Sequence, residues 1–336
     1  MINNQLLDES VFVSYMNVIK QVIDTDDRSA MWQPSYFEIM TAAALYIFGQ
    51  EGVNYAVVEV WLGGRLDATN IISSPDKVCI VTSIGYDHQK FLWDTLDLIA
   101  REKAMITHEW NHCFRYLQDD MEIDDIIASV VYEQWGVLHT VSSDCYYPLP
   151  SHFVWQHNQL NVAIVWWVLD FMAEERWLQW YDTVSELMEN CPPLLARMQI
   201  LPYHGKQVII DGAHNTQKMS SFIQWLWEIS GTDRRYVFVL AFKEDKNVWE
   251  VLQVILPYAS AIICTEFGQL QQDYPLHPMN AEVVAAYCRD LWCEDVMVEY
   301  DHHAILAMLD QYEDDVVITG SFFLASSFIT LLTHEI

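Results

Sequence analysis

The chain has 336 residues, of which 52% are hydrophobic, so it is long enough to form two domains with substantial cores. Its 47 acidic and 17 basic residues give a net charge of −30, which argues against nucleic acid and anionic membrane surfaces as partners. Seven cysteines without a C-x-x-C pair indicate free thiols, and there is neither a signal peptide nor an apolar run of membrane-spanning length. We therefore expect a cytoplasmic protein.

Hydrophobic periodicity in the first part of the chain predicts a mixture of helices and strands. In chain order we expect a helix over 35–48, strands over 55–60 and 78–84, a helix over 94–106, short strands within 126–142 and a helix over 157–174. Pro192-Pro193 then interrupts the pattern. These elements predict a first domain over residues 1–196.

Charged and polar residues lie near the carboxyl ends of the first two predicted strands. The first strand contains Glu59 and leads into Gly63-Gly64, which lets the backbone adopt positive φ or approach a ligand closely. His88 follows the second strand. Because open α/β sheets bind ligands at the carboxyl ends of their strands, this pattern predicts a site for an anion or a metal.

From Gln207 onward, strands and helices alternate regularly. The predicted strands are 207–211, 236–241, 260–265, 296–300 and 315–319, and the predicted helices are 215–229, 247–256, 280–291, 302–311 and 321–333. This alternation is typical of a doubly wound, Rossmann-like α/β domain, here over residues 197–336.

Eight segments occur together in one order and spacing along nearly the whole chain: PSYFEIMTAAALYIF (34–48), EVWLGGRLDATN (59–70), SIGYDHQKFLWDTLDLIAREKAMI (83–106), HNQLNVA (157–163), ARMQIL (196–201), IIDGAHN (209–215), AFKEDKN (241–247) and ITGSFFLAS (318–326). In this order they resemble folylpolyglutamate synthase and dihydrofolate synthase, which are members of the Mur ligase superfamily. The resemblance implies a Mur-ligase-like central α/β domain, shortened at its amino end, followed by the C-terminal domain.

The activity implied by this resemblance is an ATP-dependent amide ligation. ATP activates a carboxylate of a folate or dihydropteroate as an acyl phosphate, which the amine of L-glutamate attacks. Magnesium ions and cationic groups would stabilise the charge that develops. By the family pattern, Glu59 and His88 are magnesium ligands, and Lys103 matches a lysine that is carbamylated and so becomes an anion.

The second half of the chain supplies the nucleotide site that the resemblance implies. Arg197 matches an arginine that reaches the ATP phosphates, Asp211 an acid that holds the nucleotide, and Asn161 a residue beside the adenine. His214 lies between a predicted strand and the following helix, where free amides and the helix dipole favour a phosphate or the glutamate carboxylate. Groups from both halves would then act on one ATP.

Two departures from the family pattern bear on whether the chain has this activity. The sequence has no G-x-x-x-x-G-K-[ST] phosphate loop, since its only Gly-Lys pair is Gly205-Lys206, and tryptophans occupy positions 61, 93 and 155, where glycine is usual. We expect Trp61 to pack into a gap or to fill a pocket. Three hypotheses follow: a ligase, a non-catalytic relative that acts by binding, or a subunit whose partner chain covers an exposed sheet edge.

Overall fold

The computed structural model describes residues 1–26, 33–85, 95–117, 120–141, 156–175, 186, 194–268 and 277–335. The chain divides into two compact units, the first mainly Met1–Ile84 and Leu92–Thr140, the second mainly Val141–Gln271 and Pro275–Ile336. This division falls earlier than the domain boundary predicted at residues 196/197, which stays a prediction. Of the described helices, none is both long and apolar enough to cross a lipid bilayer.

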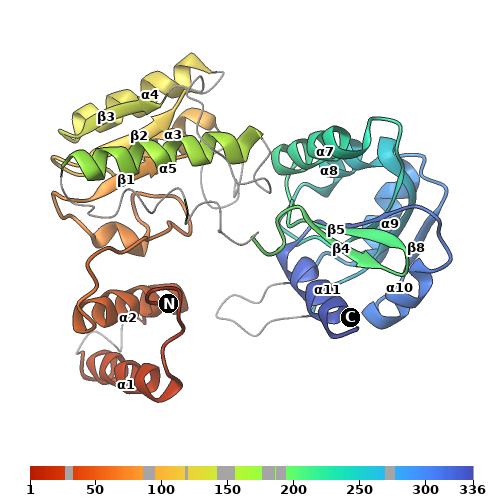
Figure 1. Ribbon diagram of the computed structural model, residues 1–336, viewed down its shortest axis with the longest axis horizontal. Coiled ribbons are helices and arrows are strands. Elements are labelled where there is room, and N and C mark those ends of the chain that lie inside the picture. Colours follow the sequence, from red (N-terminus) through yellow and green to blue (C-terminus); the bar gives the residue numbers. More distant parts are fainter. Residues whose placement is uncertain are drawn as a thin grey trace. The chain divides into compact units, whose positions relative to one another are not determined.

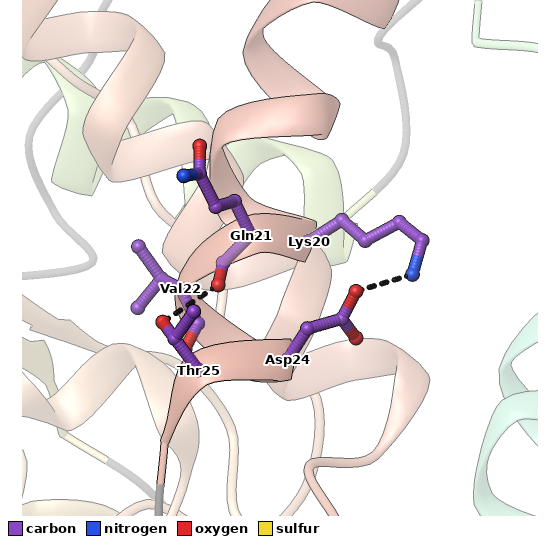
Figure 2. A network of polar contacts seen from close by, with 5 residues as sticks. All are labelled: Lys20, Gln21, Val22, Asp24 and Thr25. Atoms are coloured by element: carbon purple, nitrogen blue, oxygen red, sulfur yellow. Dashed lines mark hydrogen bonds and ion pairs between the residues drawn. The ribbon is translucent and has the colours of Figure 1, made fainter.

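The chain begins with two helices, α1 (Glu9–Thr25) and α2 (Tyr36–Gln50). The predicted helix over 35–48 is confirmed as α2, and it begins with a capping box in which Ser35 and Glu38 satisfy each other's backbone amides. Helix α1 has no buried residue. Figure 2 shows its last turns, where Lys20 forms an exposed ion pair with Asp24 at 2.6 Å.

The first unit also contains a sheet in the order β1-β2-β3, formed by Val78–Val81, His112–Tyr116 and Val137–Val141. Strands β1 and β2 are parallel, with Val78 opposite His112. Helices α3 (Leu96–Ala104) and α4 (Met121–Glu133) pack on this sheet through a core that includes Cys79, Ile99 and Ile127. The predicted strand 78–84 and helix 94–106 are therefore confirmed, with shorter bounds.

One prediction for the first unit is confirmed in part and another is wrong. Short strands were predicted within 126–142, and β3 (Val137–Val141) is one. The earlier part of that range belongs to helix α4, because Asp120 caps its amino end and the buried side chains of Ile123, Ile127 and Val130 recur at helical spacing. The predicted strand 55–60 is irregular and exposed, and Val57 is 100% accessible. A strand needs a hydrogen-bonding neighbour, and in the described residues this segment pairs with none.

The second unit contains helix α5 (Gln156–Glu174) and a sheet in the order β4-β5-β9-β6-β7-β8. Its strands are Gln199–Tyr203, Lys206–Ile210, Val316–Thr319, Tyr236–Leu240, Ala259–Cys264 and Val296–Val298 in that order. Only β4, which the sequence pattern did not predict, runs antiparallel to its neighbour in this set.

Helices cover both faces of this sheet. Helices α7 (Thr216–Ser230), α8 (Val248–Ile255) and α9 (Ala281–Asp290) pack on one face, and α10 (His302–Leu309) and α11 (Phe322–Glu335) pack on the other. Figure 1 shows α7 and α8 on the opposite side of the sheet from α10 and α11. The doubly wound C-terminal domain predicted from the alternation is confirmed, because every expected strand and helix after residue 206 is present.

Candidate functional site

The carboxyl ends of β5 and β9 form the point at which the chain leaves the sheet in opposite directions. Strand β5 continues into α7 on one face, and its neighbour β9 continues into α11 on the other. The loop after β5 is tied to the end of β9, because the Gly320 amide and the Thr319 hydroxyl donate to the Ala213 carbonyl at 2.9 and 3.3 Å. Open α/β sheets bind ligands at such a switch point.

Asp211 is the first residue of this loop and is only 3% exposed. Its carboxylate accepts hydrogen bonds from the amides of Met198 at 2.9 Å and Ala213 at 2.7 Å. Burial raises the pKa of Asp211 to about 6, although these amides and the charges of Arg197 and Lys218 act in the opposite direction. The carboxylate is therefore committed to the protein's own backbone, and it fixes the turn that carries Arg197.

Arg197 lies in a turn between two residues with left-handed backbone, Ala196 with φ of 56° and Met198 with φ of 47°. The Gly212 amide donates to the Ala196 carbonyl at 2.9 Å, so the turn is attached on both sides of the arginine to the loop after β5. The exposed Arg197 guanidinium lies over the Phe322 ring, 4.5 Å from its centre. Backbone strain of this kind clusters at functional sites.

His214 lies just before helix α7, whose N-cap is Asn215. Its Nδ1 atom is 2.8 Å from the Gly212 carbonyl oxygen, and its Nε2 atom is 3.2 Å from Lys218 Nζ. The ring also meets Phe322 edge to face, with 5.8 Å between the ring centres. Arg197 and His214 therefore contact the same phenyl ring, at the end of a helix that favours anions.

Gly212 lets these groups come together. A Cβ atom at this position would lie 2.2 Å from a carbon of the Phe322 ring, so only glycine fits without displacing the ring. The structure thus brings Arg197, Asp211 and His214, three of the residues proposed from the sequence, into one cluster. Sequence reasoning missed Phe322 and Lys218, and the one available signal for Lys218 was a cation in the first turn of a predicted helix.

The other site residues predicted from the sequence lie on other elements. Lys103 is half-buried on α3, Glu59 is exposed in the irregular segment, and Asn161 is exposed on α5. His88 lies outside the described residues, as do Trp93 and Trp155. Trp61 neither packs inside nor fills a pocket, since it is 74% exposed with its ring centre 5.6 Å from that of Phe37.

The glycine-rich turn that follows Glu59 is held by its own polar groups. Asp67 accepts hydrogen bonds from the amides of Trp61 and Leu62, each at 3.0 Å, and Asn70 donates to the carbonyl of Arg65. Gly64 approaches α3 so closely that a Cβ atom would lie 2.4 Å from the Glu102 carbonyl oxygen. The Asp67 oxygens therefore hold the backbone of this turn.

Comparisons with known proteins agree with this architecture. The family model for the C-terminal domain of dihydrofolate synthetase matches residues 197–331. Dihydrofolate synthetase of Saccharomyces cerevisiae is 25% identical over 346 residues, which cover 94% of this chain and 80% of the yeast protein. Among solved structures, Mycobacterium tuberculosis folylpolyglutamate synthase in complex with ADP and AMPPCP has a TM-score of 0.77 and 24% identity, over 97% of this chain and 79% of that one.

A second solved structure, Escherichia coli FolC in complex with DHPP and ADP, has a TM-score of 0.78 and 22% identity, over 98% of this chain and 77% of that one. The fold is that of these solved folylpolyglutamate synthases, with a mixed α/β first part and a doubly wound C-terminal domain. Residues 197–331 match the C-terminal domain of dihydrofolate synthetase, and the chain as a whole is similar to folylpolyglutamate synthases and dihydrofolate synthases.

Proposed function

We propose that this protein is an ATP-dependent ligase that joins L-glutamate to a carboxylate of a folate or dihydropteroate. The observation that carries the proposal is the cluster of Arg197, Asp211 and His214 at the carboxyl ends of β5 and β9. The cluster lies within the segment matched by the dihydrofolate synthetase model, and solved relatives hold ADP.

In the proposed reaction, a carboxylate oxygen of the acceptor attacks the γ-phosphorus of ATP and ADP leaves. The glutamate nitrogen then attacks the acyl carbon, phosphate leaves, and the nitrogen loses a proton. Arg197 would bind phosphate oxygens, because its guanidinium is exposed while its place is fixed by the turn and by Phe322. The amide end of α7 and His214 would bind the second anion, a phosphate or the glutamate carboxylate.

Asp211 would keep the role that sequence reasoning gave it, holding the nucleotide, through the turn that it fixes. Asn161 on α5 would lie beside the adenine. Both assignments are proposals. The Asp211 assignment is supported by the hydrogen bonds that its carboxylate accepts from the amides of Met198 and Ala213, the residues after Arg197 and Gly212.

Magnesium would screen the phosphates and polarise the γ-phosphorus. Glu59 offers a carboxylate of the type that Mg²⁺ prefers, and its exposure leaves it available. Within the described residues, however, no three His, Cys, Asp or Glu side chains lie together as a metal site. Glu59, His88 and carbamylated Lys103 would bind the magnesium ion jointly, and of these His88 lies outside the described residues.

A second candidate is a folylpolyglutamate synthase-like protein that binds a nucleotide or folate, alone or as a subunit with a partner chain, and does not turn over. The observation that favours it is the exposed, unpaired segment 55–60, which contains Glu59. A metal ligand on irregular, exposed backbone is poorly preorganised for catalysis.

The test is ADP release from Mg-ATP by the 336-residue chain, measured with and without glutamate and with a panel of dihydropteroate and reduced folates. The proposal expects glutamate-dependent turnover that falls about a hundredfold in Arg197→Ala and in Lys103→Ala. Lys20→Ala on α1 is the matched control, since its exposed ion pair contributes little. A folded protein that binds ADP without any turnover would favour the second candidate, and activity unaffected by both variants would refute the site.

A further inference from the structure

Lys218 occupies an unusual place for a lysine. It is the third residue of α7, after the N-cap Asn215, and it is half-buried. The helix macrodipole disfavours a cation in the first turn, where glutamate or glutamine commonly completes a capping box. The side chain nevertheless extends back toward the amino end, and its Nζ atom lies 3.2 Å from His214 Nε2.

Helix α7 does not need this side chain in order to begin. The side chain of Asn215 already accepts a hydrogen bond from the Lys218 backbone amide at 2.9 Å. A lysine that opposes the helix dipole while a separate cap is in place breaks a local rule without a gain in helix stability. Such exceptions concentrate at functional sites.

Two polar contacts of the His214 ring bear on where its proton lies. A carbonyl oxygen can only accept, so the 2.8 Å contact with Gly212 requires a hydrogen on Nδ1. An ammonium group can only donate, so the contact with Lys218 requires a lone pair on Nε2. Together they select the neutral Nδ1–H tautomer and occupy the lone pair that a general base would use.

We propose that Lys218 is a positioning residue that holds His214 as the neutral Nδ1–H tautomer and adds a cation beside it for the carboxylate of the incoming amino acid. The substrate part of this proposal rests on the proposed ligase function. Lys218 also lies close enough to Asp211 for its charge to act on that carboxylate. In this arrangement His214 is a neutral hydrogen-bonding group held in place by Lys218, and the proton of the glutamate amine leaves by another route.

The first test measures the tautomer itself and needs no turnover. The protein has 12 histidines, so ¹⁵N-histidine spectra would be assigned by comparison with His214→Gln. In the natural chain, His214 is expected to carry its hydrogen on Nδ1. In Lys218→Met, the unprotonated Nε2 resonance is expected to move downfield because it loses its hydrogen-bond donor, whereas Lys218→Arg keeps the natural spectrum. A proton on Nε2 in the natural chain, or an unchanged spectrum in Lys218→Met, would overturn the proposal.

Lys20→Met is the control for charge, because it removes one cation from α1, where Figure 2 shows Lys20 in an exposed ion pair with Asp24. Lys218→Met removes a cation that the dipole disfavours, so we expect it to fold with an unchanged or slightly higher melting temperature.

The second test is kinetic. Loss of Lys218 is expected to raise KM for glutamate about tenfold, equivalent to ~1.4 kcal/mol, with kcat nearly unchanged and with recovery in Lys218→Arg. An unchanged KM would refute the role toward substrate while the spectra decide the role toward His214. If the natural chain shows no turnover at all, the ligase proposal fails, and the spectra still test the pairing of Lys218 with His214.

Discussion

Replacing Asp211 with asparagine should change how the stability of the protein depends on pH. Burial raises the pKa of Asp211 from its ordinary value of 3.8 to about 6 in the folded chain. A carboxyl group whose pKa is raised in the folded state stabilises that state fully at pH values below its pKa in the unfolded chain. This stabilisation is lost as the pH rises through its pKa in the folded chain. The difference of ~2 units corresponds to about 3 kcal/mol, lost between pH 4 and pH 7.

Asparagine does not titrate, so Asp211→Asn lacks this contribution at every pH. It also loses one of the two amide contacts, because its NH₂ group cannot accept from Met198 or Ala213, but that offset is independent of pH. Between pH 4 and pH 7, the free energy of unfolding of the natural chain is therefore expected to fall by about 3 kcal/mol relative to the variant.

The measurement is urea-induced unfolding of both proteins at half-unit pH intervals, followed by far-ultraviolet circular dichroism. Titration of the other acidic groups cancels in the difference between the two proteins. A difference that stays constant with pH, or one that moves in favour of the natural chain as the pH rises, would refute the conclusion that burial dominates the environment of Asp211.

Two glycine substitutions test close contacts, one inside each unit. Gly212→Ala should displace the Phe322 ring and reduce stability by about 1–3 kcal/mol. It should also weaken nucleotide binding, because Arg197 rests on that ring. Thermal unfolding and ADP titration would check this, and wild-type values in both would contradict it. Gly64→Ala places a Cβ atom against the backbone of Glu102 and Lys103, which cannot rotate away, so we expect a similar loss of stability, measured by urea unfolding; an unchanged midpoint would mean that the turn does not approach α3 as described.

The C-terminal domain could be predicted from the sequence because its signals are local and consistent. Strand β6 is buried along its whole length and appears as an uninterrupted apolar run. Asn215, Asn280 and Asp301 each cap the helix that follows a strand, so the alternation of elements is marked at its boundaries. Periodicity and capping therefore gave the same answer.

The first unit was harder to predict because the same apolar pattern has two outcomes there. Val78–Val81 forms β1 because β2 pairs with it, whereas 55–60 is similarly apolar and remains irregular. A single segment does not contain the information about its partner, which lies elsewhere in the chain. The error at α4 is of the other kind, since its valines and isoleucines favour strands while their spacing and the Asp120 cap favour a helix.

The candidate site divides in the same way. Asp211 and His214 follow a predicted strand directly, so their place at the sheet edge could be predicted from the sequence. Phe322, which joins Arg197 to His214, begins helix α11 more than a hundred residues later, and the pairing of β5 with β9, the strand before α11, brings it there. Lys218 was missed because its role depends on the direction of its side chain.

Because residues with left-handed backbone lie on either side of Arg197, engineering for stability would target this turn. A search for stabilising substitutions would select glycine or asparagine at Ala196 and Met198, where each L-residue with positive φ costs about 1 kcal/mol. Such variants would melt at a higher temperature or unchanged, yet glycine would also free the backbone on both sides of the arginine. The strained backbone thus goes with the fixed position of Arg197. Thermostability alone is a misleading guide for redesigning this part of the protein.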